Sequence, residues 1–303
     1  MEKRMNEVKS WPTGLIEVAP STYAYIQAIG SAGISNAGLV VGSDQGFVID
    51  VLITITRTLE FLDSIRRVTQ LPISHILLTH SHTDHFLGLQ VLMPTKVVSH
   101  AFCREWMRIN GVAAAKHWVE FRPEFTEGLL GFRLCLPDET FEDRITFYSG
   151  DKEIQFFNWG NVHTRGDGLV YLPKERVLFA GDIAFFQVTP LAWQGHIGNW
   201  IKALNRILDM EIETIVPGHG PVGGKAELAE MRDYLQLVYD GAKESFNRGL
   251  SESEAAKAIK LGKYSTWANP ERIEKNVIRS YQELRGEDAT MNRLFSNEVL
   301  IDG

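Results

Sequence analysis

The chain has 303 residues, of which 44% are hydrophobic and 23% are charged, so its composition excludes a mainly disordered protein. A chain of this length buries roughly three quarters of its surface on folding, which is enough for a large core. Acidic residues outnumber basic ones 38 to 31, and the net charge of −7 argues against a nonspecific nucleic-acid or membrane-surface binder.

Cysteine content and the absence of long apolar segments narrow the class of protein further. The two cysteines, Cys103 and Cys135, are too few for a disulfide framework or a cysteine-based zinc finger. Residues 1–11 carry charges but no apolar stretch, so we expect no signal peptide. No apolar run approaches the ~20 residues of a membrane span. We therefore expect a soluble, cytoplasmic protein whose partner is a small-molecule substrate.

The first third of the chain has the pattern of a sheet that incorporates one helix. Short apolar segments predict strands at 15–18 and 23–29, and a glycine-rich turn between 38–41 and 47–51 predicts a hairpin. Helical spacing of apolar residues follows at 58–68, and a β-rich segment follows at 73–79. Strand, helix and strand in this order predict a parallel βαβ unit.

The remaining chain adds a second group of strands and a helical tail. We expect an irregular excursion over 110–143, after helices at 86–92 and 101–109 that flank a strand at 96–99. Further strands are predicted at 144–148, 153–158, 169–172, 177–180 and 214–216, and helices at 199–208, 225–246, 252–259 and 271–284. Ser251 and Glu254 have the spacing of a capping box that opens the helix at 252. The pattern predicts a mixed α/β sandwich with a C-terminal helical extension.

The segment His80-Ser81-His82-Thr83-Asp84-His85 is the most informative motif in the sequence, because so dense a pattern of histidine and aspartate is rarely coincidental. In an extended segment, alternate side chains point to one side, so His80 and His82 can share one metal ion. Asp84 and His85 lie where the chain enters the next helix and can diverge toward a second ion. Imidazole and carboxylate are ligands for zinc, with iron or manganese as further candidates.

Three more candidate ligands lie at the ends of a predicted strand and of a hairpin. His80 begins just past the carboxyl end of a strand, where open α/β sheets place their sites, and His219 occupies a similar position after 214–216. His163 precedes the hairpin of 169–180 and Asp182 follows it, so the hairpin brings the two together. The sequence thus predicts seven ligands from four loops at one edge of the sheets.

These seven residues resemble the ligand pattern of the metallo-β-lactamase superfamily, over about residues 14–222. The resemblance implies a four-layer αβ/βα sandwich with a two-metal site at its edge. It also implies that one metal is bound by His80, His82 and His163, the other by Asp84, His85 and His219, and that Asp182 bridges them. Asp50 matches an early aspartate that would support the ligands through hydrogen bonds. Asp167 stands where the family commonly has histidine and would lie in the same supporting shell.

Details of the pattern distinguish branches of this superfamily. The zinc β-lactamases typically have cysteine or serine at the bridging position, so Asp182 resembles the general metallo-hydrolase branch and not a true β-lactamase. The aromatic segment after Asp182 is similar to a branch that acts on small molecules. An apolar wall with a few polar groups is typical of ligand sites, and we expect the substrate pocket to include Phe185, Phe186, Trp193, His196 and Trp200.

The resemblance implies a binuclear metallo-hydrolase with two zinc ions per chain. A hydroxide shared by the metals would attack an ester, lactone, amide or activated aryl substrate, and Asp84 would orient it and transfer a proton to the leaving group. Two alternatives stay open: an iron-dependent oxidoreductase like the persulfide dioxygenases, which hold one iron by two histidines and one aspartate, and a metal-binding protein without catalytic activity. We expect a catalytic domain over 1–235, a helical extension over 236–303 packed on it, and possible homodimers.

Overall fold

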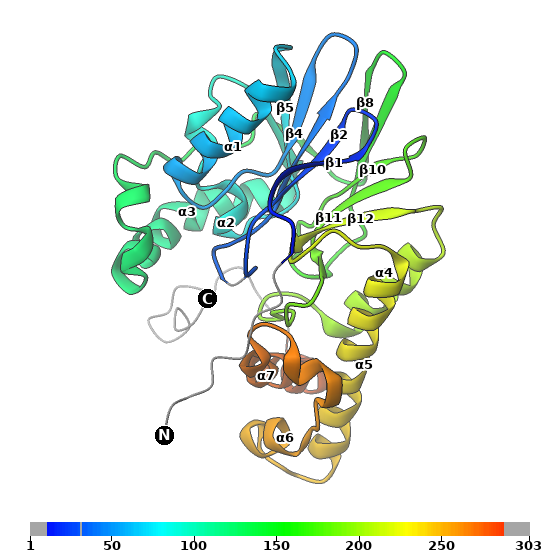
Figure 1. The fold of residues 1–303 in the computed structure, drawn as a ribbon. Coiled ribbons are helices and arrows are strands. Elements are labelled where there is room, and N and C mark those ends of the chain that lie inside the picture. The colour runs from blue at the N-terminus through cyan, green and yellow to red at the C-terminus, as the bar shows by residue number, and fades with distance from the viewer. Residues whose placement is uncertain (1–10, 31, 288–303) are drawn as a thin grey trace.

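Two β-sheets stack face to face between helices in a computed structural model that describes residues 11–30 and 32–287 (Figure 1). The seven-stranded sheet follows chain order and contains β1 (Gly14–Ala19), β2 (Thr22–Ile26), β3 (Ala37–Val41), β4 (Gly46–Ile49), β5 (Ile73–Leu78), β6 (Lys96–His100) and β7 (Glu139–Phe141). The five-stranded sheet has the order β12 (Thr214–His219), β11 (Val177–Phe185), β10 (Leu169–Leu172), β9 (Lys152–Phe157) and β8 (Arg144–Ser149).

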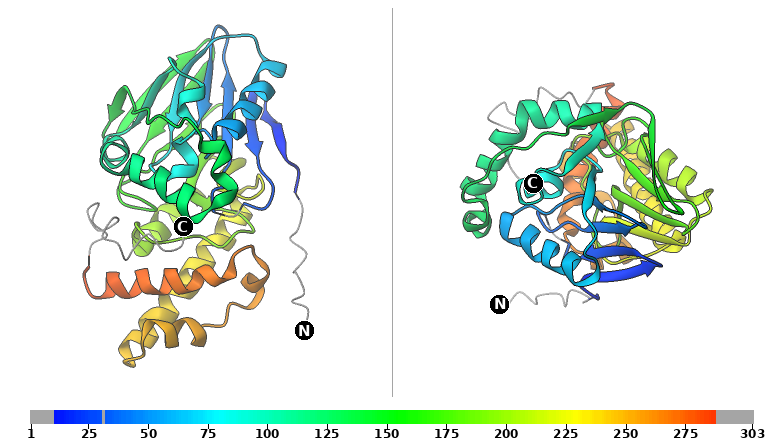
Figure 2. Two further views of the ribbon diagram at one scale, coloured as in Figure 1. Left: turned by 90° about the vertical axis from the view of Figure 1, so that its left-hand side faces the viewer. Right: turned by 90° about the horizontal axis from the view of Figure 1, so that it is seen from above.

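Helices cover the outer face of each sheet, which gives four layers (Figure 2). On one side lie α1 (Ile55–Val68) and α3 (Ala101–Phe121), and on the other α4 (Ile197–Leu208) and α5 (Lys225–Asn247). Successive side chains of a strand point to opposite faces of its sheet. In β4, Phe47 and Ile49 face the other sheet, whereas Val48 faces the helices. The expected four-layer α/β sandwich is confirmed.

The predicted βαβ unit is present and consists of β4, α1 and β5. β3 and β4 form the predicted hairpin, α1 follows, and β5 pairs with β4 in parallel. α1 begins at Ile55, three residues earlier than expected. Thr54 caps it there, because its side chain accepts a hydrogen bond from the backbone N–H of Arg57 at 3.2 Å. β4 and β5 therefore end at the same edge of the sheet.

Two helical predictions were wrong in their bounds. α3 continues to residue 121, through part of the expected irregular excursion. Gly111 argues for a break there, but the alanines after it favour helix, and a Cβ at Gly111 would lie 2.8 Å from Leu134. The helix expected over 86–92 is divided into α2 (Thr83–Phe86) and a 3₁₀ turn (Leu89–Val91), because Gly88 packs against Thr58 too closely for a side chain.

The C-terminal helices lie below the sheets, alongside the lower part of α5 (Figure 1). They are α6 (Glu252–Ala258) and α7 (Ile273–Leu284), which pack on α5 and on each other. The division expected at residue 235 falls inside α5, which is continuous from Lys225 to Asn247. The outer parts of both expected units, residues 1–10 and 288–303, lie outside the described residues.

The predicted capping box at the start of α6 is confirmed. The hydroxyl oxygen of Ser251 accepts from the backbone N–H of Glu254 at 3.3 Å, and the carboxylate of Glu254 accepts from the backbone N–H of Ser251 at 2.8 Å. Ser251→Ala is expected to lower the free energy of unfolding by about 1 kcal/mol, measured by urea denaturation. Ser265→Ala, which removes a hydroxyl that caps no α-helix, is the control. An unchanged midpoint for Ser251→Ala would contradict the prediction.

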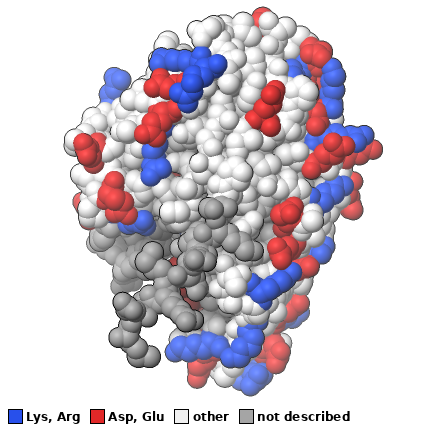
Figure 3. Space-filling view, viewed as in Figure 1, with Lys and Arg blue, Asp and Glu red and all other residues white. Residues whose placement is uncertain are grey.

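The surface charges are mixed in sign, and the helices are not apolar along their whole length. Lysine and arginine side chains alternate with aspartate and glutamate over the face drawn in Figure 3, without a large area of one sign. Among the helices in the described part of the chain, none is long and apolar enough to cross a membrane.

Candidate metal centre

All seven predicted ligands meet at the edge where the two sheets come together. His80, His82, Asp84 and His85 follow β5 and enter α2, while His163 precedes β10. Asp182 lies within β11, where the pairing with β12 is shifted in register, and His219 ends β12. All seven residues are buried, with 0–8% of each residue's surface exposed.

One group of candidate ligands contains three of the five predicted histidines together with the aspartate that is expected to bridge the metals. One ligand atom from each of these residues lies within 4.8 Å of the others: His80, His82, His163 and Asp182. His163 Nε2 is 2.9 Å from His82 Nδ1 and 3.3 Å from Asp182 Oδ2. Four donors of this kind at this separation can surround one metal ion.

The second group lies against Asp182 of the first. Ligand atoms of Asp84, His85 and His219 also lie within 4.8 Å of one another. Asp182 approaches two members of this group, because its Oδ1 is 3.1 Å from His85 Nε2 and its Oδ2 is 3.3 Å from His219 Nε2. Asp182 therefore lies between the two groups, and one carboxylate can reach both.

The outer nitrogen of each of four histidines has a hydrogen-bond partner that orients the ring. Asp50 Oδ2 lies 2.8 Å from His85 Nδ1, and the backbone oxygen of Ile34 lies 3.1 Å from His219 Nδ1. Gln194 Oε1 lies 2.8 Å from His82 Nε2, and Thr79 Oγ1 lies 3.1 Å from His80 Nδ1. Each acceptor can take the imidazole N–H, which leaves the other nitrogen free to bind a metal.

Several inward-facing polar atoms make ion-pair contacts with one another but no well-aligned hydrogen bond within the described residues. They are buried, and include His80 Nε2, His85 Nε2 and Asp182 Oδ1. Orphaned polar atoms in a protein interior are costly unless something compensates them. Because these atoms face one point and are imidazole nitrogens and a carboxylate oxygen, the donor set fits divalent metal ions such as zinc.

The pKa values of the clustered histidines are shifted in different directions. Burial, with the neighbouring imidazoles, holds the pKa of His80 and of His82 well below the ordinary histidine value. Burial opposes the charged form of His85 as well, but the surrounding carboxylates outweigh it and hold its pKa well above the ordinary value. Burial would raise the pKa of Asp182, yet the imidazoles around it hold that pKa well below its usual range. Asp182 is thus kept as an anion among nitrogen donors.

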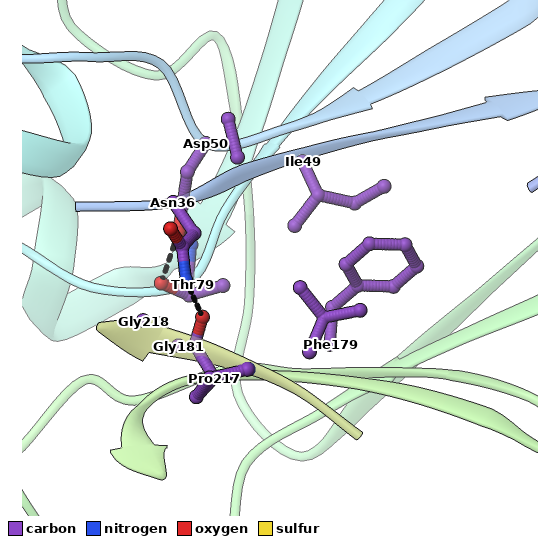
Figure 4. Close-up of a pocket in the computed structure, with 10 residues that line it drawn as sticks. Asn36, Ile49, Asp50, Thr79, Phe179, Gly181, Pro217 and Gly218 are labelled. Atoms are coloured by element: carbon purple, nitrogen blue, oxygen red, sulfur yellow. Dashed lines mark hydrogen bonds between the residues drawn. The ribbon is translucent and has the colours of Figure 1, made fainter. Parts of the chain in front are cut away.

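Hydrogen bonds around a small cavity fix the chain segments that carry His80 and His219 (Figure 4). Asp50 accepts hydrogen bonds from the backbone N–H and the hydroxyl of Thr79, both at 2.7 Å, and so fixes the end of β5. The amide of Asn36 donates to the backbone oxygens of Pro217 at 2.9 Å and Gly220 at 2.8 Å, which fixes the His219 loop. A Cβ at Gly218 would lie 1.9 Å from Asp182 Oδ1, so glycine is required there.

Asp167 closes the loop that carries His163. Its carboxylate accepts from the backbone N–H groups of His163 at 2.7 Å and Thr164 at 2.9 Å. Burial raises its pKa to about 6, although these donated hydrogen bonds oppose the rise. Asp167 therefore supports the backbone of a ligand without touching an imidazole, a role that a histidine ring could not perform in the same way.

The five expected pocket residues occupy two different environments. Phe185, Phe186 and Trp200 are at most 1% exposed, and therefore pack behind the ligands instead of lining open space. Phe185 stacks on His219 with ring centroids 4.9 Å apart, and Trp200 meets His163 edge-on at 5.0 Å.

The other two members of that set are half-buried. Trp193 stacks on His82 with ring centroids 5.0 Å apart, at the accessible side of the cluster. His196 caps α4 by accepting from the backbone N–H of Asn199, and its Nδ1 lies 3.2 Å from the carboxylate of Glu283. The structure thus places Trp193 beside a ligand and gives His196 a structural contact with α7.

The C-terminal helices hold the loop that carries Trp193 and Gln194. The buried Asn276 of α7 accepts from the backbone N–H of Ala192 at 2.8 Å and donates to the backbone oxygen of Pro190 at 2.9 Å. Glu283 accepts from the backbone N–H groups at the start of α4, which fixes the other end of the loop. The helical extension therefore supports the loop that contacts His82.

Gln194 is a site residue that sequence reasoning missed. Its amide oxygen fixes the ring of His82, and a substitution that removes this acceptor is expected to weaken metal binding by about 10- to 100-fold. Gln194→Leu tests this by equilibrium dialysis against zinc, with Gln236→Leu on the exposed face of α5 as the matched control. Equal zinc affinity in the two variants would contradict the assigned role.

Comparison with known proteins gives one family and several distant relatives. A sequence model of the metallo-beta-lactamase superfamily matches residues 30–219, more than half of the chain. A linear primary-alkylsulfatase from Pseudomonas sp. (strain ATCC 19151) is 20% identical over 264 residues, which cover 73% of this chain and 49% of the relative. A metallo-beta-lactamase type 2 from Bacillus cereus is 23% identical over 213 residues, 68% of this chain and 75% of the relative.

The solved structures show the same fold. The sec-alkylsulfatase Pisa1 from Pseudomonas sp. superposes with a TM-score of 0.70 at 19% identity, over 91% of this chain and 51% of that chain. The present chain thus spans about half the length of the alkylsulfatases that it matches. Identities this low establish the architecture and leave the substrate open.

Proposed function

Because this chain belongs to the metallo-beta-lactamase superfamily, we propose that it is a hydrolase that uses two zinc ions to cleave a small-molecule ester, lactone, amide or activated aryl compound. The single observation that carries this proposal is the convergence of seven buried histidine and aspartate side chains into two groups joined by Asp182. Iron and manganese suit the same donors and are outcomes of the test.

The residues divide between the two metals as their positions suggest. His80, His82 and His163 would hold one ion, while Asp84, His85 and His219 would hold the other, and Asp182 would touch both. Two divalent ions, when bound, lower the pKa of water and polarise an oxygen atom of the substrate. Asp50, Thr79 and Gln194 keep the imidazoles in the required orientation.

Asp84 is the ligand best placed to move a proton. Its Oδ2 lies 3.4 Å from His219 Nε2, and its side chain is 10% exposed, compared with 5% for Asp182. A carboxylate at the open side can accept a proton from water and return it to the leaving group. His85, in contrast, is completely buried.

Exposure also indicates the direction of substrate approach. The ligands are 0–1% exposed at His85, His80 and His163 but 7–8% exposed at Asp84 and His82. Trp193, stacked on His82, provides an apolar surface on this side. A small substrate would therefore enter along Trp193 and meet Asp84.

The proposal is tested by assaying purified protein against a panel of esters, lactones, amides, β-lactams and phosphoesters while its metal content is varied. We expect hydrolysis of at least one class to rise and fall with zinc occupancy. Turnover by metal-stripped protein would contradict the proposal. About one iron per chain with oxygen consumption would identify an oxidoreductase, and full metal loading without turnover on the panel would favour a non-catalytic protein.

A further inference from the structure

Three consecutive residues just before β3, Ile34, Ser35 and Asn36, contact two members of the second ligand group; we call them the β3 entry segment. The hydroxyl of Ser35 donates to the backbone oxygen of Asp84 at 2.6 Å. The backbone oxygen of Ile34 lies 3.1 Å from His219 Nδ1 and can accept the N–H of that ring. Ser35 and Asn36 are at most 3% exposed. One short buried segment therefore holds Asp84 and His219 together.

Asn36 fixes the chain on both sides of the ligand that ends β12. Its Nδ2 donates to the backbone oxygens of Pro217 at 2.9 Å and Gly220 at 2.8 Å. Its own backbone N–H donates to the oxygen of Gly218 at 2.7 Å. Its Oδ1 accepts from the backbone N–H of Gln27 at 3.2 Å, so both donors and the acceptor of the side-chain amide are used. Alanine at this position would leave two carbonyl groups without their donor.

The histidines of the first group are held by other parts of the chain. Three residues form hydrogen bonds with their rings or backbone, namely Gln194, Thr79 and Asp167. Within the described residues, no hydrogen bond joins the β3 entry segment to any of these histidines. Asp50 differs, because it contacts His85 of the second group and also Thr79, which contacts a histidine of the first. The two groups thus share Asp50 but differ in their remaining supports.

We propose that the β3 entry segment sets the affinity of the second metal site and leaves that of the first site unchanged. The inference rests on the proposed two-metal function, to which it adds the residues that position one of the two ions. Hydrogen bonds that orient metal ligands change metal affinity by about 10- to 100-fold. The alternative is a purely structural role, in which the segment stabilises the whole fold and its loss weakens both ions alike.

Titration of metal-free protein with zinc, in competition with a chromophoric chelator, tests the proposal without any substrate. We expect Asn36→Ala to weaken one of the two zinc ions by about 10- to 100-fold and the other by less than about threefold. Ser35→Ala should weaken the same ion by about tenfold, because it loses the hydrogen bond to the backbone of Asp84. Equal weakening of both ions in Asn36→Ala would assign the segment a structural role and overturn the inference.

Gln194→Leu shows which ion is affected, because Gln194 holds the ring of His82 in the first group. Cadmium binds the same donors as zinc, and its NMR spectrum gives one signal for each bound ion. In cadmium-loaded protein, Asn36→Ala and Gln194→Leu should each shift or abolish a different signal, and the double variant should change both. If Asn36→Ala and Gln194→Leu changed the same signal, the inference would be overturned.

Matched controls separate these effects from a general loss of stability. Ser251→Ala removes a hydroxyl that caps α6, and Asn205→Ala removes an exposed amide on α4. Both control variants should bind two zinc ions with wild-type affinity. Unchanged affinity for both ions in Ser35→Ala would overturn the inference even if Asn36→Ala fails to fold, as would a wild-type protein that binds one zinc ion. Two bound ions without hydrolysis would count against the proposed function alone.

Discussion

Asp182→Ala is expected to remove both metal binding and activity, with kcat/KM reduced by at least about 10³-fold. The reason is position: Asp182 lies 3.1–3.7 Å from nitrogen atoms of four ligand histidines, His80, His85, His163 and His219. Without its carboxylate, His80 and His163 would lose the carboxylate that they contact, and Asp84 would be the one aspartate left among the seven candidate ligands. Metal analysis of the dialysed protein, together with turnover of whichever substrate the panel identifies, measures both effects.

Two variants make this result specific. Asp182→Asn keeps the size of the side chain and removes its charge, so it should also lose metal. Asp233→Ala removes an aspartate that is 55% exposed on α5, and should bind metal as the wild type does. If Asp182→Ala kept the metal content and turnover of the wild type, Asp182 would not be a ligand that bridges two metals.

Trp200→Ala is expected to give the largest loss of stability, about 4 kcal/mol. The indole is fully buried between the five-stranded sheet and α5, and its Nε1 donates to the backbone oxygen of Ile183 at 2.9 Å. Alanine would leave a cavity and an unpaired carbonyl group. Thermal unfolding should show a midpoint lower by roughly 10 °C, since 1 kcal/mol shifts a domain of this size by about 2–4 °C.

Trp200 also supports His163, and this gives the variant a second readout. The rings meet edge-on at 5.0 Å, so the cavity would free His163 to move. We expect zinc affinity to fall along with stability in Trp200→Ala, and to fall less in Trp200→Phe, which refills most of the volume. A stable Trp200→Ala protein with wild-type zinc affinity would contradict the role of Trp200 as a wall behind the ligand.

Much of the fold was predictable because its signals are local. A β-rich apolar segment located β5, and the Gly-rich turn located the hairpin of β3 and β4. The predicted bounds of the helices at 101–109 and 86–92 were wrong where Gly111 and Gly88 pack against other parts of the chain. Both glycines allow close packing against residues far away in sequence, and composition cannot reveal such contacts.

The candidate ligands were predictable for a different reason. His80 to His85 form one dense motif, and His163, Asp182 and His219 follow strands or a hairpin, so topology alone brings them to one edge. The supporting residues lack such a signal. Gln194 contacts a histidine 112 residues away, and Asn36 contacts Pro217 across 181 residues. The aromatic residues after Asp182 were expected in a pocket, yet most of them pack behind the ligands, because burial depends on which helix covers β11.

Zinc titration of metal-free protein tests the central claim most directly, namely that seven side chains hold two metal ions on which hydrolysis depends. Hydrolysis of the substrate found in the panel is followed as zinc is added, and bound zinc is measured on the same samples. We predict that activity is absent without metal, rises with added zinc and saturates at about two ions per chain. Full activity before any zinc is added, or binding of zinc that leaves hydrolysis unchanged, would contradict the account.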